Sequence, residues 1–193
     1  MGAGWHGRHG IARSTPLRSF VVGCATSTDQ TKRGIRTRPA CPSAVRSTTH
    51  CQAPTQLAHG LAPRLRRRGR GGVLFTSSVE GLVGCPYSAG YSATKAYVNA
   101  LGEALWAELA PAGVDVLTLC PGATDTEAPR LQGVDPTTLQ DLMSPDDVAR
   151  SALKHLREGP THIPSAHYRQ VFDTLLAMPR RDALTAMARS MGE

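Results

Sequence analysis

The chain has 193 residues and a formal net charge of +7, which is long enough for one domain with a buried core. The charge is unevenly distributed, because residues 1–70 carry 13 Lys and Arg against one acid and residues 71–193 carry 9 against 14. No run of about 18 apolar residues predicts a membrane span. The arginines lack interleaved aromatic residues and a folded basic face, so nucleic acid is not an expected partner either.

Residues 1–51 are predicted to form a low-order basic segment. They are rich in Arg, Ser, Thr, Pro and Gly, show no lasting helical or strand period, and contain one short strand-like run at Phe20-Val21-Val22. Three interpretations stay open for this segment: a disordered tail, an organelle-targeting presequence, or the product of a shifted reading frame.

Clear elements follow from residue 52. A helix is predicted to end at Arg66-Arg67-Arg68-Gly69, because cations in a last turn followed by Gly form a stop signal. Apolar runs predict buried strands at 72–76 and 114–120, separated by a helix over 91–109. Ser144-Pro145-Asp146-Asp147 predicts the start of a helix that runs to residue 157, and one or two helices are expected over 166–190.

This alternation of helices and strands indicates the α/β class with parallel strands. Only the strands at 72–76 and 114–120 and a weak one near 161–164 are expected, so a long edge of the sheet is predicted to remain unpaired. We therefore expect a truncated, partial Rossmann-like doubly wound parallel sheet over residues 52–193, preceded by a disordered or irregular segment.

The residues that indicate chemistry surround Tyr91. Tyr91 lies four residues before Lys95 on a predicted helix, so the two side chains share a face. Ser78 follows the strand at 72–76, and Pro121-Gly122 follows the strand at 114–120. Because ligands of open α/β sheets bind outside the carboxyl ends of the strands, these residues are expected to meet there. The alternative interpretation is an exposed helix pair and an ordinary turn residue.

The stretches Gly71-Gly-Val-Leu-Phe-Thr-Ser-Ser-Val-Glu-Gly81 and Pro86-Tyr-Ser-Ala-Gly-Tyr-Ser-Ala-Thr-Lys-Ala96 resemble the Ser loop and the Tyr-x-x-x-Lys helix of the short-chain dehydrogenase/reductase family. Pro121-Gly-Ala-Thr-Asp-Thr126 resembles the later cofactor turn of that family. The resemblance covers residues 52–193, about the second half of a family member.

The resemblance implies an NAD(P)-dependent oxidoreductase that interconverts alcohols and carbonyls, with a small-molecule substrate. The implied catalytic residues are Tyr91 as general acid/base, Ser78 as the donor that orients the substrate oxygen, and Lys95, which with the nicotinamide charge favours the phenolate. Ser77 corresponds to a less critical neighbour. The implied residues that bind NAD or NADP are Tyr91, Lys95, Pro121, Gly122, Thr124 and Thr126.

The sequence departs from the family at its beginning. The expected Gly-x-x-x-Gly-x-Gly turn, whose amides hold the pyrophosphate, is absent, and Met1-Gly-Ala-Gly4 is the nearest candidate. The residue that selects NAD or NADP is missing too. The alternative function is therefore a catalytically silent fragment that acts as a dimerising or binding protein.

Three further expectations concern partners, metal and compartment. By the resemblance, the helix at 91–109 and the helix before Arg66 form a homo-oligomer face. The five cysteines show no metal-type spacing, so no metal site is expected. The expected compartment is the cytoplasm, or an organelle if the basic segment is a presequence. The substrate-covering loop over residues 123–143 has a mild apolar bias that is compatible with lipid, steroid, acyl or aliphatic carbonyls.

Overall fold

The fold is built on a parallel sheet in the order β1-β2-β3-β4. The computed structural model describes residues 19–22, 48–131 and 134–192. The strands are β1 (Ser19–Val22), β2 (Gly71–Thr76), β3 (Val114–Leu119) and β4 (Thr161–His162). The sheet is the parallel α/β architecture that the sequence predicts.

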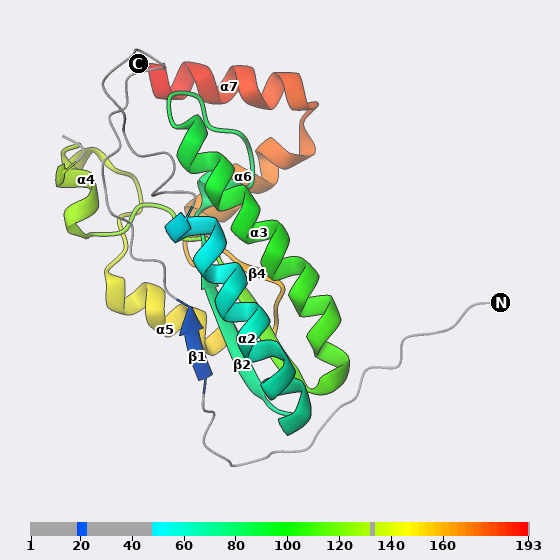
Figure 1. Ribbon diagram of the computed structural model, residues 1–193. Coiled ribbons are helices and arrows are strands. Elements are labelled where there is room, and N and C mark those ends of the chain that lie inside the picture. The colour runs from blue at the N-terminus through cyan, green and yellow to red at the C-terminus, as the bar shows by residue number, and fades with distance from the viewer. Residues whose placement is uncertain (1–18, 23–47, 132–133, 193) are drawn as a thin grey trace.

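The helices connect and cover these strands (Figure 1). They are the π-helix η1 (Thr48–Gln52), α2 (Ala53–Arg68), the 3₁₀ turn η2 (Val79–Gly81), α3 (Ala89–Leu109), the 3₁₀ turn η3 (Ala110–Ala112), α4 (Glu127–Leu131), the 3₁₀ turn η4 (Pro136–Thr138), α5 (Pro145–His155), α6 (Ala166–Ala177) and α7 (Arg180–Gly192).

The edge of β2 that was expected to remain unpaired is paired with β1. β1 pairs with β2 in parallel, with Ser19 opposite Gly72 and Val22 opposite Phe75. The strand-like run in the basic segment therefore adds a fourth strand, because β2 offers a row of backbone donors and acceptors to any parallel segment. Apart from 19–22 and 48–51, the segment 1–51 lies outside the described residues, as does Met1-Gly-Ala-Gly4.

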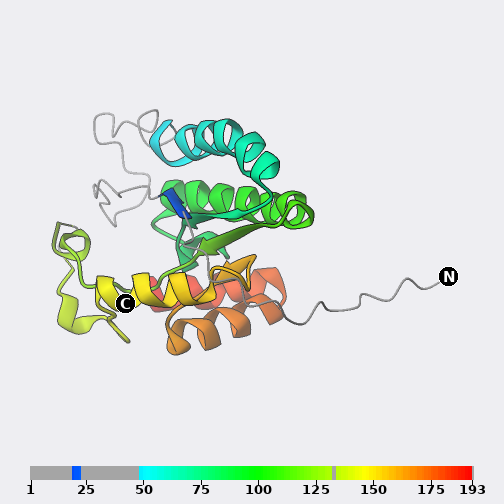
Figure 2. The same ribbon diagram turned by 90° about the horizontal axis from the view of Figure 1, so that it is seen from below.

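Side chains from β2 and β3 alternate between two cores, so both faces of the sheet are covered. Figure 2 shows α2 and α3 on one face and α5, α6 and α7 on the other. The core under α2 and α3 consists of Ala58, Leu65, Val73, Phe75, Val98, Leu109, Val114 and Val116, and the core under α5 consists of Leu74, Leu117, Leu119, Val148, Ala152 and Leu156. This period-two alternation with helices on both faces is the doubly wound arrangement.

The predicted helix boundaries follow from local signals. Gly69 ends α2 in the left-handed conformation with φ 63°, and its N–H donates to the carbonyls of Leu65 and Arg66. Ser144 begins α5 by accepting a hydrogen bond from the backbone N–H of Asp147 at 3.1 Å. The helix ends at His155 rather than at residue 157, because the chain turns there with the Glu158 N–H donating to the His155 carbonyl.

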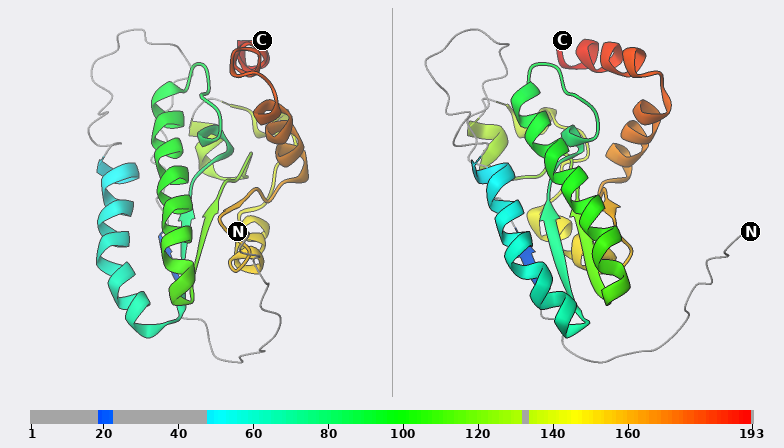
Figure 3. Two further views of the ribbon diagram at one scale, coloured as in Figure 1. Left: turned by 90° about the vertical axis from the view of Figure 1, so that its right-hand side faces the viewer. Right: turned by 45° about the vertical axis from the view of Figure 1, so that its right-hand side comes forward.

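A third apolar cluster lies beyond the sheet, where α6 and α7 fold over the end of β3 (Figure 3). It consists of Val79, Val83, Cys85, Cys120, Phe172 and Met187. Cys85 and Cys120 are free thiols that pack as small apolar residues. The cluster closes one side of the region outside the carboxyl ends of β2 and β3.

Candidate active site

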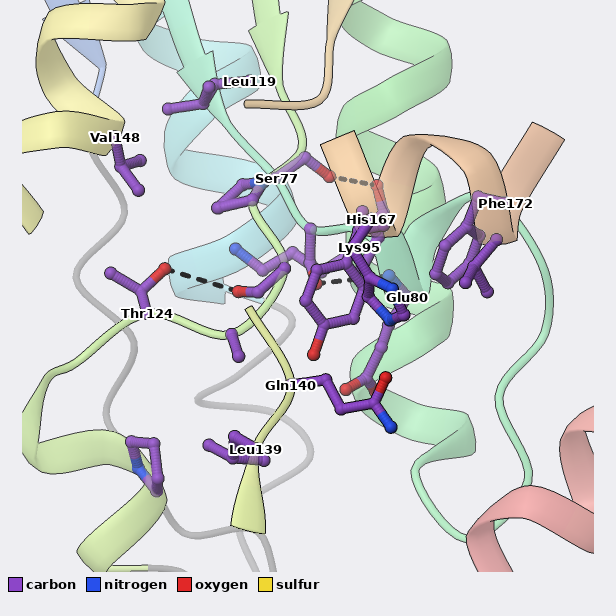
Figure 4. A pocket seen from close by; sticks show the side chains of 18 of the residues that line it. Ser77, Glu80, Lys95, Leu119, Thr124, Leu139, Gln140, Val148, His167 and Phe172 are labelled. Atoms are coloured by element: carbon purple, nitrogen blue, oxygen red, sulfur yellow. Dashed lines mark hydrogen bonds between the residues drawn. The ribbon is translucent and has the colours of Figure 1, made fainter. Parts of the chain in front are cut away.

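A cavity of about 880 Å³ opens at the carboxyl ends of β2 and β3 (Figure 4). All seven residues singled out in the sequence line it: Ser78, Tyr91, Lys95, Pro121, Gly122, Thr124 and Thr126. They come from three segments that are separated in the chain. They meet because parallel strands present their carboxyl ends at one edge of the sheet.

Ser77 and Ser78 follow β2 and have different surroundings. The buried Ser77 donates its hydroxyl to the Lys95 carbonyl at 2.9 Å, which fastens the end of β2 to α3. Ser78 caps η2, where its Oγ accepts a hydrogen bond from the Glu80 N–H at 3.2 Å, and it lines the cavity. Both serines therefore line the cavity, and the Ser77 hydroxyl is engaged in a contact that joins β2 to α3.

Gly81 allows η2 to press directly on α3. A Cβ at this position would lie 2.6 Å from the Lys95 carbonyl carbon and 2.8 Å from the Ala96 nitrogen. Real side chains do not fit at such distances, so only glycine permits this approach. The approach fixes the position of the Ser78 turn relative to Tyr91 and Lys95, which are carried by α3.

Lys95 is an almost fully buried cation, with 1 % of its surface exposed. Its Nζ donates a hydrogen bond to the Thr76 carbonyl at 3.2 Å and lies 5.5 Å from the centre of the Tyr91 ring. Burial of a charge is costly unless it is hydrogen-bonded, and the end of β2 supplies part of that compensation. Lys95 is therefore held beside the phenol, as the spacing of four residues predicts.

The pKa of Tyr91 is raised from its usual 10.0 to about 12, first by burial and then by the negative charge of Glu80. The Cys85 and Cys120 thiols raise this pKa slightly, and a hydrogen bond with the Ser78 side chain lowers it. The phenol is therefore a neutral acid at physiological pH. The expected stabilisation of the phenolate by Lys95 together with the nicotinamide charge stays a prediction.

The segment after β3 folds into a turn over the cavity. Thr124 pairs with Met143 in a parallel bridge, the Met143 N–H donates to the Ala123 carbonyl at 3.1 Å, and the Asp125 N–H donates to the Met143 carbonyl at 2.9 Å. A Cβ on Gly122 would lie 2.1 Å from the ring of Tyr168. The glycine thus lets α6 place an aromatic ring against this turn.

Several cavity residues were missed in the sequence. Glu80 stands two positions after Ser78, inside the quoted loop, so its position near the phenol was available from the motif. Gln140, His167 and Tyr168 also line the cavity, and no local motif marks them. They reach the cavity only because the loop before α5 and the helix α6 fold back over it.

The nicotinamide portion of a dinucleotide fits the residues present. Lys95, Thr124 and Thr126 offer hydrogen-bonding groups around a cavity with room for a planar ring, and Gly122 keeps the turn free of a side chain. The described residues contain no glycine-rich turn that would hold the pyrophosphate. The structure therefore supports a site for the reactive portion only.

Within the described part of the chain, no group of three or more His, Cys, Asp or Glu side chains is arranged to hold a metal ion. No helix among these residues is long and apolar enough to cross a membrane.

Comparison with known proteins identifies the family. Residues 46–133 match the family model described as short chain dehydrogenase. The matched residues 46–133 therefore identify this part of the chain with the short-chain dehydrogenase/reductase family. This family consists of oxidoreductases, and the match contains both the Ser78 loop and the Tyr91–Lys95 helix.

Two curated relatives show how much of the chain the similarity covers. The chain is 27% identical over 136 residues to a 7beta-hydroxysteroid dehydrogenase of Clostridium sardiniense, covering 70% of this chain and 52% of the relative. It is 36% identical over 119 residues to a dehydrogenase/reductase SDR family protein 7-like of Drosophila melanogaster, covering 56% of this chain and 36% of that protein. The chain thus spans about half, or less, of the curated relatives it matches.

A solved structure extends the likeness. The short-chain dehydrogenase from Sphingobium yanoikuyae in complex with NADPH is 30% identical, with a TM-score of 0.68. The match covers 86% of this chain and 63% of that one. The sheet, the covering helices and the cavity edge are therefore those of a Rossmann-like family member of which this chain spans a part.

Proposed function

We propose that this chain is an NAD(P)-dependent oxidoreductase that interconverts an alcohol and a carbonyl compound, with Tyr91 as the general acid/base. The observation that supports this most is the convergence of Ser78, Tyr91 and Lys95 on one cavity beside the cofactor turn. A neutral, half-buried phenol beside a buried ammonium is suited to proton transfer to a substrate oxygen.

Ser78 and Tyr91 share the substrate oxygen in this mechanism. The Ser78 hydroxyl donates a hydrogen bond that orients the oxygen, and Tyr91 donates its proton to that oxygen during reduction. In the oxidative direction Tyr91 accepts the proton, which requires the phenolate. Lys95 provides a fixed positive charge beside the ring, and this charge counters the effect of burial when the proton leaves.

The proposed cofactor is NAD or NADP, held on its reactive side by Tyr91, Lys95, Pro121, Gly122, Thr124 and Thr126. When bound, a reduced nicotinamide supplies the hydride for this class of reaction. The NADPH in the Sphingobium relative supports NADP as the first cofactor to test.

We expect NADPH to bind the purified chain with saturable, micromolar affinity, measured by fluorescence titration beside a parallel titration with NADH. Lys95→Met should abolish this binding, because the buried ammonium faces the cavity. Lys154→Met removes an exposed ammonium on α5 and should leave the affinity unchanged. Circular dichroism of each variant shows whether the fold is retained.

Absence of binding at millimolar NADPH and NADH would refute the oxidoreductase proposal for this chain. It would favour the second candidate, a catalytically silent family fragment that acts as a dimerising or binding protein. The observation behind this alternative is the partial coverage, since the chain spans 63% of the Sphingobium structure.

We further propose that the chain forms a homo-oligomer through α2 and α3. The outward face of α3 carries the small exposed residues Ala96, Ala100 and Ala104, and Tyr97 and Leu57 beside them are 41% and 50% exposed. A groove of about 320 Å³ runs between the two helices. Small residues on an exposed apolar helix face let a second helix approach closely.

A dimer is therefore expected in size-exclusion chromatography with light scattering. Ala100→Arg should shift the protein to a monomer, since a long charged side chain cannot be buried in the middle of such a face. Ala177→Arg places the same charge at the exposed end of α6 and should leave the dimer intact. A wild-type monomer at high concentration would refute the proposed face.

The proposed compartment is the cytoplasm. Cys85 and Cys120 are buried free thiols, which agrees with a reducing environment.

A further inference from the structure

Glu80 is the only acid among the described residues that line the cavity. It lies on η2, two residues after Ser78, and is half-buried. Figure 4 shows it with Gln140 and His167 among the side chains of the cavity wall. No Lys, Arg or His of the described chain lies within ion-pair distance of its carboxylate. The carboxylate is thus a negative charge without a cationic partner in that part of the protein.

Local contacts hold this carboxylate in place. Ser88 donates its hydroxyl to Glu80 Oε2 at 2.5 Å. The Glu80 carbonyl accepts a hydrogen bond from the Ser92 hydroxyl at 2.7 Å, and the adjacent Gly81 packs against the α3 backbone. Both the side chain and the main chain of Glu80 are hydrogen-bonded to the start of α3, which also carries Tyr91. The position of the carboxylate relative to Tyr91 is therefore fixed.

The charge also acts on the groups around it. The negative charge of Glu80 is among the causes that raise the pKa of Tyr91, of Cys85 and of Tyr168. The Glu80 carboxylate is therefore close enough to act electrostatically on the Tyr91 phenol and on the Tyr168 ring, which packs against Gly122. A cationic group bound at Glu80 would therefore lie near the reacting oxygen.

The remainder of the cavity wall is mostly apolar. Side chains from the loop before α5 and from α6 and α7 contribute Val134, Leu139, Val171, Phe172, Leu175, Met187 and Met191. A carboxylate against such a wall is poorly compensated. A neutral hydroxyl offers it one hydrogen bond, whereas an ammonium offers charge-assisted hydrogen bonds and neutralises the charge.

We propose that Glu80 binds a protonated amino group of the substrate, and that the substrate class is an apolar amino ketone or amino alcohol. The apolar wall would hold the hydrocarbon part, while Ser78 and Tyr91 hold the oxygen. The amino group is bound and is unchanged by the reaction. The assignment of substrate class rests on the proposed oxidoreductase function, but the binding of the amine does not.

Calorimetric titration at neutral pH with two probes of equal length tests the site without cofactor or turnover. Octylammonium should bind the wild-type chain more tightly than 1-octanol. Glu80→Gln, which keeps the shape and removes the charge, should weaken octylammonium binding by about tenfold or more and leave 1-octanol unaffected. Glu158→Gln removes an exposed carboxylate at the end of α5 and should change neither affinity.

Glu80→Asp provides a second variant if Glu80→Gln does not fold, as judged by circular dichroism. Glu80→Asp keeps the charge and should therefore bind octylammonium more tightly than Glu80→Gln does. If Glu80→Gln does not fold, Glu80→Asp should still bind octylammonium more tightly than 1-octanol. Equal octylammonium affinity in the wild type and Glu80→Gln, or tighter binding of 1-octanol than of octylammonium by the wild type, would overturn the assignment.

The two proposals fail in distinguishable ways. A chain that does not bind NADPH but prefers octylammonium in a Glu80-dependent way refutes the oxidoreductase and supports the amine site. A chain that binds NADPH and shows no such preference supports the oxidoreductase and refutes the amine site.

Discussion

Tyr91→Phe should reduce the rate of NADPH-dependent ketone reduction by about 10²- to 10⁴-fold, the range that general acid catalysis contributes. The substitution removes only the phenolic oxygen, so the ring keeps its packing beside the Lys95 ammonium, which lies 5.5 Å from its centre. The affinity for NADPH should remain within a few-fold of the wild type, since the ring and Lys95 are retained. Absorbance of NADPH measures the turnover, and the fluorescence titration measures the affinity.

Tyr87→Phe is the matched control. Tyr87 precedes α3, is 48% exposed, and is not among the described residues that line the cavity, so its hydroxyl should contribute nothing to turnover. Retained activity in Tyr91→Phe would show that the phenol is not the acid.

The pH profile gives a second check. Because the pKa of Tyr91 is raised to about 12, the free chain keeps this proton at neutral pH, and only the oxidative direction should become faster as the pH rises toward that value.

The elements that the sequence predicts well are those with signals inside the element. The three arginines before Gly69 and the Ser144-Pro145 pair mark helix boundaries through contacts within a few residues, and the structure has a helix end and a helix start at these positions. β1 was different. Its strand-like run Phe20-Val21-Val22 was visible in the sequence, but its pairing was not. The partner strand β2 lies about fifty residues later, and a local pattern does not contain that information.

The site residues also divide into those with a local sequence signal and those placed by distant segments. The seven motif residues could be expected to meet, because the carboxyl ends of neighbouring parallel strands lie together whatever the remainder of the chain does. Tyr168 is brought against Gly122 by the path of α6, and its contribution could not be read from spacing. The direction of the Tyr91 pKa shift also required the structure, because it depends on burial and on the place of the Glu80 charge.

Gly102→Ala should destabilise the fold strongly and disturb the site from a distance. Gly102 is buried on α3, and a Cβ there would lie 1.9 Å from Thr118 Oγ1 and 3.2 Å from Thr118 Cβ on β3. Helix and strand would have to separate, at a cost of about 1–3 kcal/mol or more for overpacking, which exceeds the gain of about 1 kcal/mol from alanine in a helix. Because α3 also carries Tyr91 and Lys95, turnover should fall together with the free energy of unfolding measured in urea.

Gly60→Ala on α2 is the control for helix propensity. A Cβ at Gly60 meets nothing within 4 Å, so this variant should be more stable than the wild type by about 0.5–1 kcal/mol. The two Gly→Ala substitutions should change the free energy of unfolding in opposite directions. This difference separates the steric cost at the α3–β3 contact from the higher helix propensity of alanine. Combining Gly102→Ala with Thr118→Ala removes the obstructing hydroxyl and should recover part of the lost stability. Equal stability of Gly102→Ala and Gly60→Ala would mean that α3 does not lie as close to β3 as the structure has it, and that Tyr91 is positioned by other contacts.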